Sequence, residues 1–107
     1  CVVFIQLLDE PVDAEVMADA LVEELTLLMP VPKVTRFTTY GSLTGEGRTM
    51  RGIMYVIAGE IRVFAHTTPT WTLVVHEQCY DEDLARVRPG YDLIERTLRV
   101  VDPAEYP

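Results

Sequence analysis

The chain has 107 residues, of which 49% are apolar and 24% are charged, a composition that predicts one folded domain over 1–107 and excludes intrinsic disorder. Its 17 acidic and 9 basic residues give a formal net charge of −8, which repels phosphate backbones and excludes nucleic acid as the expected partner. No apolar stretch approaches the ~20 residues of a membrane-spanning helix, so we expect a soluble protein with no transmembrane segment in this chain.

The first third of the chain predicts a strand and then a helix. Residues 2–8 form a continuous apolar run rich in β-branched residues, which is typical of a strand buried on both faces. Because this run follows Cys1 directly, we expect a further strand or leader to precede it. Asp13 is the expected N-cap of a helix over about 13–29, along which apolar residues recur every three or four positions until Pro30.

The middle of the chain predicts four antiparallel strands in succession. Polar and apolar alternation and β-branched residues place them at about 33–40, 48–58, 61–66 and 71–77. Ala58-Gly59-Glu60 is the expected tight turn between the second and third of these strands. The glycines of segment 41–47 predict a hairpin loop, since that segment lacks the Gly-Lys-Ser/Thr ending of a phosphate-binding loop.

The last part of the chain predicts a second amphipathic helix. Apolar residues recur in steps of three and four from Leu84 onward, and Pro89-Gly90 interrupts the pattern. We therefore expect a short turn at 81–87 and a main helix over about 89–99. The predicted fold is an α+β domain in which two helices cover an antiparallel sheet. A ferredoxin-like βαββαβ fold, with 98–101 as the last strand, is the alternative architecture.

The two histidines are the first candidates for a metal site. Zinc needs three or four ligands such as imidazole and thiolate. A turn centred on Thr68 would set His66 opposite Thr70 and His76 opposite Glu60, so the imidazoles would not meet. We therefore expect no metal ligands and no cofactor.

The cysteines offer a nucleophile or a disulfide. Cys79 follows His76 by three residues, but nothing in the sequence supplies a group that orients the base or an oxyanion donor. We therefore expect no catalytic residues and no enzyme. Cys1 and Cys79 are either bridged or two unrelated thiols, and both interpretations stay open.

A small cationic and aromatic sheet face is the candidate binding surface. Arg51 and Arg62 lie on two strands that we expect to pair, and they share a face with Tyr55 and Phe64. The competing interpretation is that these arginines cover the outer face and pair with nearby glutamates. Trp71 opens the last strand, where it is either part of the core or the rim of a ligand groove.

Two segments resemble a known fold. Residues 45–68, GEGRTMRGIMYVIAGEIRVFAHTT, resemble two long central strands joined by a tight turn, and 70–101 resemble a final strand, an acidic segment and a closing helix that ends in Thr97-Leu98-Arg99. This order is similar to the PsbP/Mog-like fold superfamily, which includes the PsbP extrinsic photosystem protein, the DcrB and Eag chaperone group and the actinobacterial LpqN-type lipoproteins. The resemblance implies a bacterial scaffold for other proteins, without a conserved active site, in the cell envelope or secreted.

These observations leave three hypotheses for function. The first is a non-enzymatic protein-binding module, an adaptor, assembly factor or chaperone, that presents a sheet face or a strand edge to another protein. A second copy of the chain is one candidate partner. The alternative is a carrier whose groove between sheet and helices holds a small apolar ligand. The third, an enzyme that uses His76 and Cys79, lacks the remaining catalytic groups.

Overall fold

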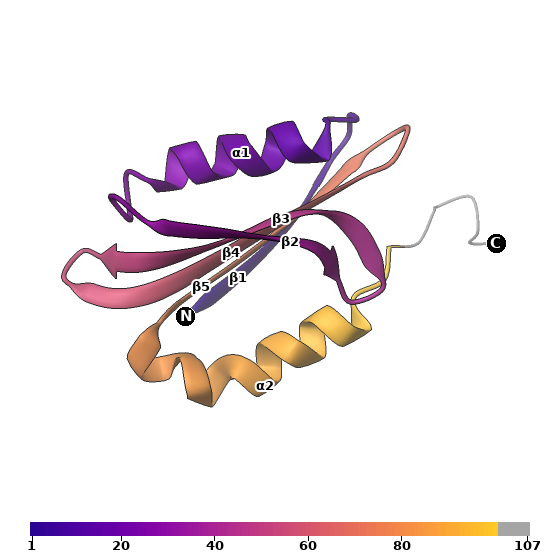
Figure 1. The fold of residues 1–107 in the computed structure, drawn as a ribbon. Coiled ribbons are helices and arrows are strands. Elements are labelled where there is room, and N and C mark those ends of the chain that lie inside the picture. Colours follow the sequence, from indigo (N-terminus) through magenta and orange to yellow (C-terminus); the bar gives the residue numbers. More distant parts are fainter. Residues whose placement is uncertain (101–107) are drawn as a thin grey trace.

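The protein folds as one antiparallel sheet with a helix on each face, in a computed structural model that describes residues 1–100 (Figure 1). In chain order the elements are β1 (Val2–Leu8), α1 (Ala14–Leu25), β2 (Lys33–Tyr40), β3 (Leu43–Met54), β4 (Ile57–Thr67), β5 (Thr72–Tyr80) and α2 (Asp81–Thr97). The sheet order is β1-β5-β4-β3-β2, so α1 carries the chain from one edge of the sheet to the other. The predicted α+β class is confirmed.

Helix α1 covers one face of β3 and β4. Its N-cap is Asp13, as predicted, and the Asp13 carboxylate accepts a hydrogen bond of 3.1 Å from the Val16 amide. The helix ends at Leu25, before the predicted 29, and Met29 follows in the next turn as a fully buried residue. The apolar stripe of the helix packs on a cluster made of Met29, Met50, Met54, Ile61 and Val63.

Helix α2 covers the opposite face, over β4 and β5 (Figure 1). The predicted break is wrong, because α2 runs through Pro89 as one helix. Pro89 lies on the exposed side of the helix, so its missing N–H costs one backbone hydrogen bond without burying an unsatisfied group. The buried side of the helix presents Leu84 and Tyr91 to the sheet beside Cys79.

The turn between β3 and β4 is at Tyr55-Val56, so the predicted turn at Ala58-Gly59-Glu60 is wrong. Gly59 is instead a strand residue of β4 opposite Gly52. A Cβ atom on Gly59 would lie 2.1 Å from Cε of Met54, so this glycine makes room for a buried side chain. Strands β3 and β4 are accordingly offset from the predicted ranges.

The predicted hairpin loop over 41–47 is mostly wrong. Only Gly41, with φ of 60°, lies in the turn that joins β2 to β3, and Gly45 and Gly47 belong to β3. A Cβ atom on Gly47 would lie 2.3 Å from the ring of Phe37. A β-bulge between Phe37 and Thr39 then turns Tyr40 to the same face as Phe37.

The register of β4 and β5 differs from the prediction. His66 lies opposite Leu73, and His76 lies opposite Val63 rather than Glu60. Strand β5 also continues to Tyr80, because its last residues still pair with Gly59 and Glu60 of β4, so His76 is in mid-strand. The ferredoxin-like alternative is wrong, since β2 to β5 follow one another without a helix between them and 98–100 form no strand. Residue 101 lies outside the described residues.

Strand β1 was expected to be buried on both faces, and this prediction is wrong. The sheet order places β1 at an edge, beyond the strands that the two helices cover. Most of its apolar side chains are therefore exposed, Phe4 and Leu7 most of all.

We predict that Asp13→Ala lowers the free energy of unfolding by about 1 kcal/mol, because the first turn of α1 loses its side-chain acceptor. Chemical denaturation of both proteins measures the difference. Asp9→Ala is the control, since Asp9 is an exposed carboxylate just before the helix and its loss should change stability by less than ~0.5 kcal/mol. Equal effects of the two substitutions would contradict the N-cap assignment.

Candidate functional site

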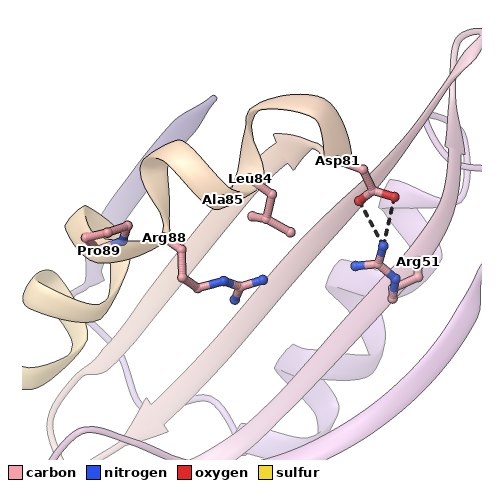
Figure 2. A pocket seen from close by; sticks show the side chains of 6 residues that line it. All are labelled: Arg51, Asp81, Leu84, Ala85, Arg88 and Pro89. Carbon is pink, nitrogen blue, oxygen red and sulfur yellow. Dashed lines mark hydrogen bonds and ion pairs between the residues drawn. The ribbon is translucent and has the colours of Figure 1, made fainter.

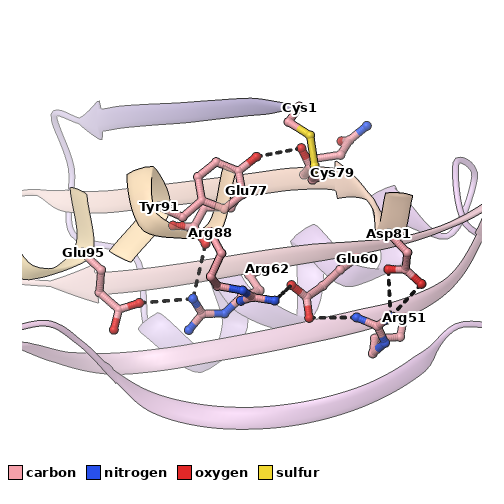
Figure 3. A network of polar contacts seen from close by, with 11 residues as sticks. Cys1, Arg51, Glu60, Arg62, Glu77, Cys79, Asp81, Arg88, Tyr91 and Glu95 are labelled. Atoms are coloured by element: carbon pink, nitrogen blue, oxygen red, sulfur yellow. Dashed lines mark hydrogen bonds and ion pairs between the residues drawn. A yellow bond between two sulfur atoms is a disulfide. The ribbon is translucent and has the colours of Figure 1, made fainter. Parts of the chain in front are cut away.

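A network of charged side chains lies between the sheet and α2 (Figure 3). At its centre, Arg62 Nη1 lies 3.3 Å from Glu77 Oε1 and 3.1 Å from Glu95 Oε1. The guanidinium carbon of Arg62 also lies 4.5 Å from the centre of the Phe37 ring, within the range of a cation–π interaction. Arg62 is thus committed to contacts inside the protein.

Glu77 is the buried carboxylate of this network, with 3% of its surface exposed. The Tyr40 hydroxyl donates a hydrogen bond of 2.6 Å to Glu77 Oε2. Burial raises the pKa of Glu77 above its usual range, against the opposing effects of the Tyr40 hydrogen bond and the Arg62 charge. Burial also raises the pKa of Tyr40, and the neighbouring carboxylate adds to that increase. The pair joins β2 to β5 across the sheet.

A cavity of about 590 Å³ lies beside this network, at the start of α2 (Figure 2). Its lining residues are Arg51, Asp81, Leu84, Ala85, Arg88 and Pro89. Arg51 Nη2 donates to both Asp81 carboxylate oxygens, at 2.8 and 2.9 Å. Glu60 accepts from Arg51 at 3.0 Å and from Arg88 at 3.4 Å. Each arginine of the cavity therefore has a carboxylate partner.

The five candidate site residues do not form one exposed surface. Arg51, Arg62 and Phe64 share the face under α2, as predicted, but Phe64 is buried. Tyr55 lies in the β3–β4 turn with 76% of its surface exposed. Trp71 precedes β5, half-buried, with its ring 5.8 Å from that of His66. Their role in binding stays a prediction.

The two histidines, the candidate metal ligands, lie on opposite faces of the sheet. The strand register places His66 on the α2 face, where its Nδ1 is 2.6 Å from the Thr44 carbonyl oxygen, and His76 on the α1 face beside Gln78. Within residues 1–100, no group of three or more potential ligands gathers at a metal site. Cys79 forms a disulfide with Cys1, so no thiol is left for the proposed nucleophile.

The edge formed by β1 is the feature that sequence reasoning missed. Residues 2–8 carry no charge, and 60% of Phe4 and 58% of Leu7 are exposed. The opposite edge, β2, carries Lys33 and Arg36 and a β-bulge, devices that keep strand edges from pairing. An uncharged run looks the same in sequence whether it is buried or open, so only the sheet order distinguishes the two.

Two observations show which backbone groups of β1 point outward. The Tyr91 hydroxyl lies 3.1 Å from the Val2 carbonyl oxygen and 3.0 Å from that of Gln78, as expected when both carbonyl groups point between the strands in a hydrogen-bonded pair. The Cα atoms of Cys1 and Cys79 are 4.3 Å apart, the spacing of a non-hydrogen-bonded pair. By alternation, the N–H and C=O groups of Val3, Ile5 and Leu7 point away from β5.

No protein-family model matches this sequence, and neither does any curated protein or solved structure. The resemblance to the PsbP/Mog-like superfamily therefore stays a prediction. Neither helix described in residues 1–100 is long and apolar enough to cross a membrane.

We predict that Glu77 makes the protein less stable as the pH rises. Its pKa is higher in the folded than in the unfolded state, so between the usual value of 4.5 and the raised value the folded state binds more protons. The unfolding free energy of the wild type, relative to that of Glu77→Gln, should therefore fall as the pH rises through this window.

Chemical denaturation at a series of pH values measures this difference. Glu24→Gln, at an exposed position of α1, is the control for the loss of one surface carboxylate, and its effect on stability is subtracted from that of Glu77→Gln. A wild-type advantage that grows with pH would show instead that the Arg62 charge outweighs the burial of Glu77.

Proposed function

We propose that this protein is a non-enzymatic protein-binding module that adds an extended strand of a partner to the edge of β1. The outward N–H and C=O groups of Val3, Ile5 and Leu7 carry this proposal, because they offer a partner strand a row of unused hydrogen bonds. The apolar side chains on both faces of β1 then add contact area on either side of the new strand.

The edge is favoured over a sheet face because the helices occupy the faces. Helix α1 lies over β3 and β4, and α2 lies over β4 and β5. The candidate arginines of the sheet face, Arg51 and Arg62, are engaged with carboxylates of the same chain. A partner on that face would have to displace these ion pairs.

The start of β1 is held in place before any partner arrives. The Cys1–Cys79 disulfide joins β1 to β5, and Tyr91 of α2 donates to the backbone of the same pair of strands. A strand that is fixed in advance loses less conformational entropy on binding. Because disulfides persist in oxidising compartments, the bridge also supports a location outside the cytosol, in the cell envelope or secreted.

A second copy of the chain fits this edge. In an antiparallel pairing centred on Ile5, each Val3 lies opposite Leu7 of the other copy, and Ile5 lies opposite itself, so one face becomes continuously apolar. The three residues are also those with outward backbone groups, so the register needs no shift.

The carrier alternative receives less support from the structure. The large cavity beside α2 is lined by Arg51, Asp81 and Arg88, and a small apolar ligand would leave these charges without water.

We predict that a synthetic peptide with the sequence VVFIQLL binds to β1. In a titration followed by ¹H–¹⁵N spectra, the shifts should concentrate at the amides of Val3, Ile5 and Leu7. Ile5→Lys should weaken the binding by about tenfold, since a charge would lie against the apolar partner strand. Val34→Lys, at a comparably exposed position on the other edge, is the matched control and should bind as the wild type does. Equal binding by Ile5→Lys, or shifts centred on β2, would contradict the proposal.

We also predict a dimer at high protein concentration that is strengthened by salt, because each copy carries a net charge of −8 and salt screens their repulsion. Sedimentation velocity at low and high ionic strength measures the association. A dimer that persists in Ile5→Lys, or that dissociates as salt is added, would show that the copies meet elsewhere.

A further inference from the structure

Two loops at one end of the sheet expose the most accessible large apolar side chains of residues 1–100. These are Val31 at 96%, Leu27 at 89%, Val56 at 87% and Tyr55 at 76% exposure, which together we name the apolar tip. Leu27 and Val31 belong to the connection between α1 and β2, and Tyr55 and Val56 form the β3–β4 turn.

The two loops of the apolar tip are neighbours. Lys33 pairs with Arg51 in the β2–β3 register, and a Cβ atom on Gly52 would lie 3.6 Å from Cα of Pro32. Figure 1 shows both loops at the same end of the sheet. Met29, which is fully buried, packs in the core and holds the first loop in place.

The backbone keeps these side chains outward. Val31 and Tyr55, with φ of 51° and 60°, are the two non-glycine residues with left-handed backbone among residues 1–100. A β-branched residue rarely adopts this conformation, and such strain gathers at functional positions.

The charges around the apolar tip are arranged as a lipid surface would require. Neither 25–32 nor 52–59 contains a charged residue, although the chain has 26. Lys33, the only lysine, lies directly behind the tip and forms no ion pair within residues 1–100. Its ammonium group is therefore available to a lipid phosphate while the tip lies among the acyl chains.

The shape of the apolar tip favours lipid over a protein partner. Each of its four side chains is at least 76% exposed, so they project from the surface rather than line a hollow for a partner's side chain. A lipid interface adapts to a protruding apolar shape, and the amphipathic ring of Tyr55 suits the level of the headgroups.

We propose that the apolar tip inserts into the interface of a lipid surface, with Lys33 at the level of the phosphates. This role is independent of the β1 edge.

Flotation with vesicles of phosphatidylcholine tests the proposal. The wild type should float with the vesicles, and because insertion is apolar, raising the salt concentration should not release it. Leu27→Ser/Val56→Ser should lower the partition coefficient between vesicles and water by about tenfold or more, since two apolar side chains that would insert into the lipid are lost. Neither substitution touches the left-handed residues, and far-ultraviolet circular dichroism of the double variant checks that it folds as the wild type does.

Val16→Ser is the matched control, because Val16 is 61% exposed at the other end of α1, and it should bind as the wild type does. Ile5→Lys should also keep its vesicle binding, which separates this proposal from that for β1. Wild-type protein that never floats would overturn the lipid assignment. It would indicate instead that the apolar tip inserts into a pocket of a partner protein. Release by salt, or equal partition of the double variant, would overturn the lipid assignment as well.

Discussion

The pairing of β1 with β5 determines both how the core under α2 is completed and which edge of the sheet is left free. It makes β5 an inner strand, so that Leu73, Val75 and Cys79 have neighbours on both sides under α2. It also decides which backbone groups of β1 remain free. The disulfide between Cys1 and Cys79 holds two residues that are 78 positions apart in the sequence, so it restricts the unfolded chain strongly as well. The same pairing that completes the core thereby creates the open edge.

The polar network under α2 occupies this face of the sheet with contacts inside the protein. Burying Glu77 would be costly for an isolated charge, and Tyr40 and Arg62 offset part of this cost through hydrogen bonds and charge. Each partner comes from a different strand, so the network fixes the relative position of β2, β4 and β5. A ligand that separated Arg62 from Glu77 would leave a buried carboxylate without its charge partner.

Local signals in the sequence predicted what depends on neighbours along the chain. Alternation located β2 at its observed bounds, and Asp13 was identified as an N-cap because its residue type and its position before an apolar stripe suffice. Predictions failed where the conformation of a residue depends on contacts with residues far away in the sequence. Gly59 resembles a turn residue, yet it is required by Met54 across the hairpin. Pro89 resembles a helix boundary, yet it is accommodated because that side of α2 is exposed.

The candidate site was less predictable than the fold. Arg51 and Arg62 were placed on one face correctly, but their carboxylate partners Asp81 and Glu95 come from α2, whose position over the sheet no local pattern encodes. The open edge of β1 was missed for the same reason. An apolar segment is expected to be buried, but its sequence does not show whether it is buried within the same chain or against a partner.

Amide hydrogen exchange along β1 measures whether the outer edge of this strand is free. In a dilute sample of monomeric protein, the amides of Val3, Ile5 and Leu7 should exchange rapidly, while those of Phe4 and Gln6, which face β5, should be protected. Such alternation would show an edge with free donors. Uniform protection along 2–8 would show that the edge is already paired and that β1 has no free donors.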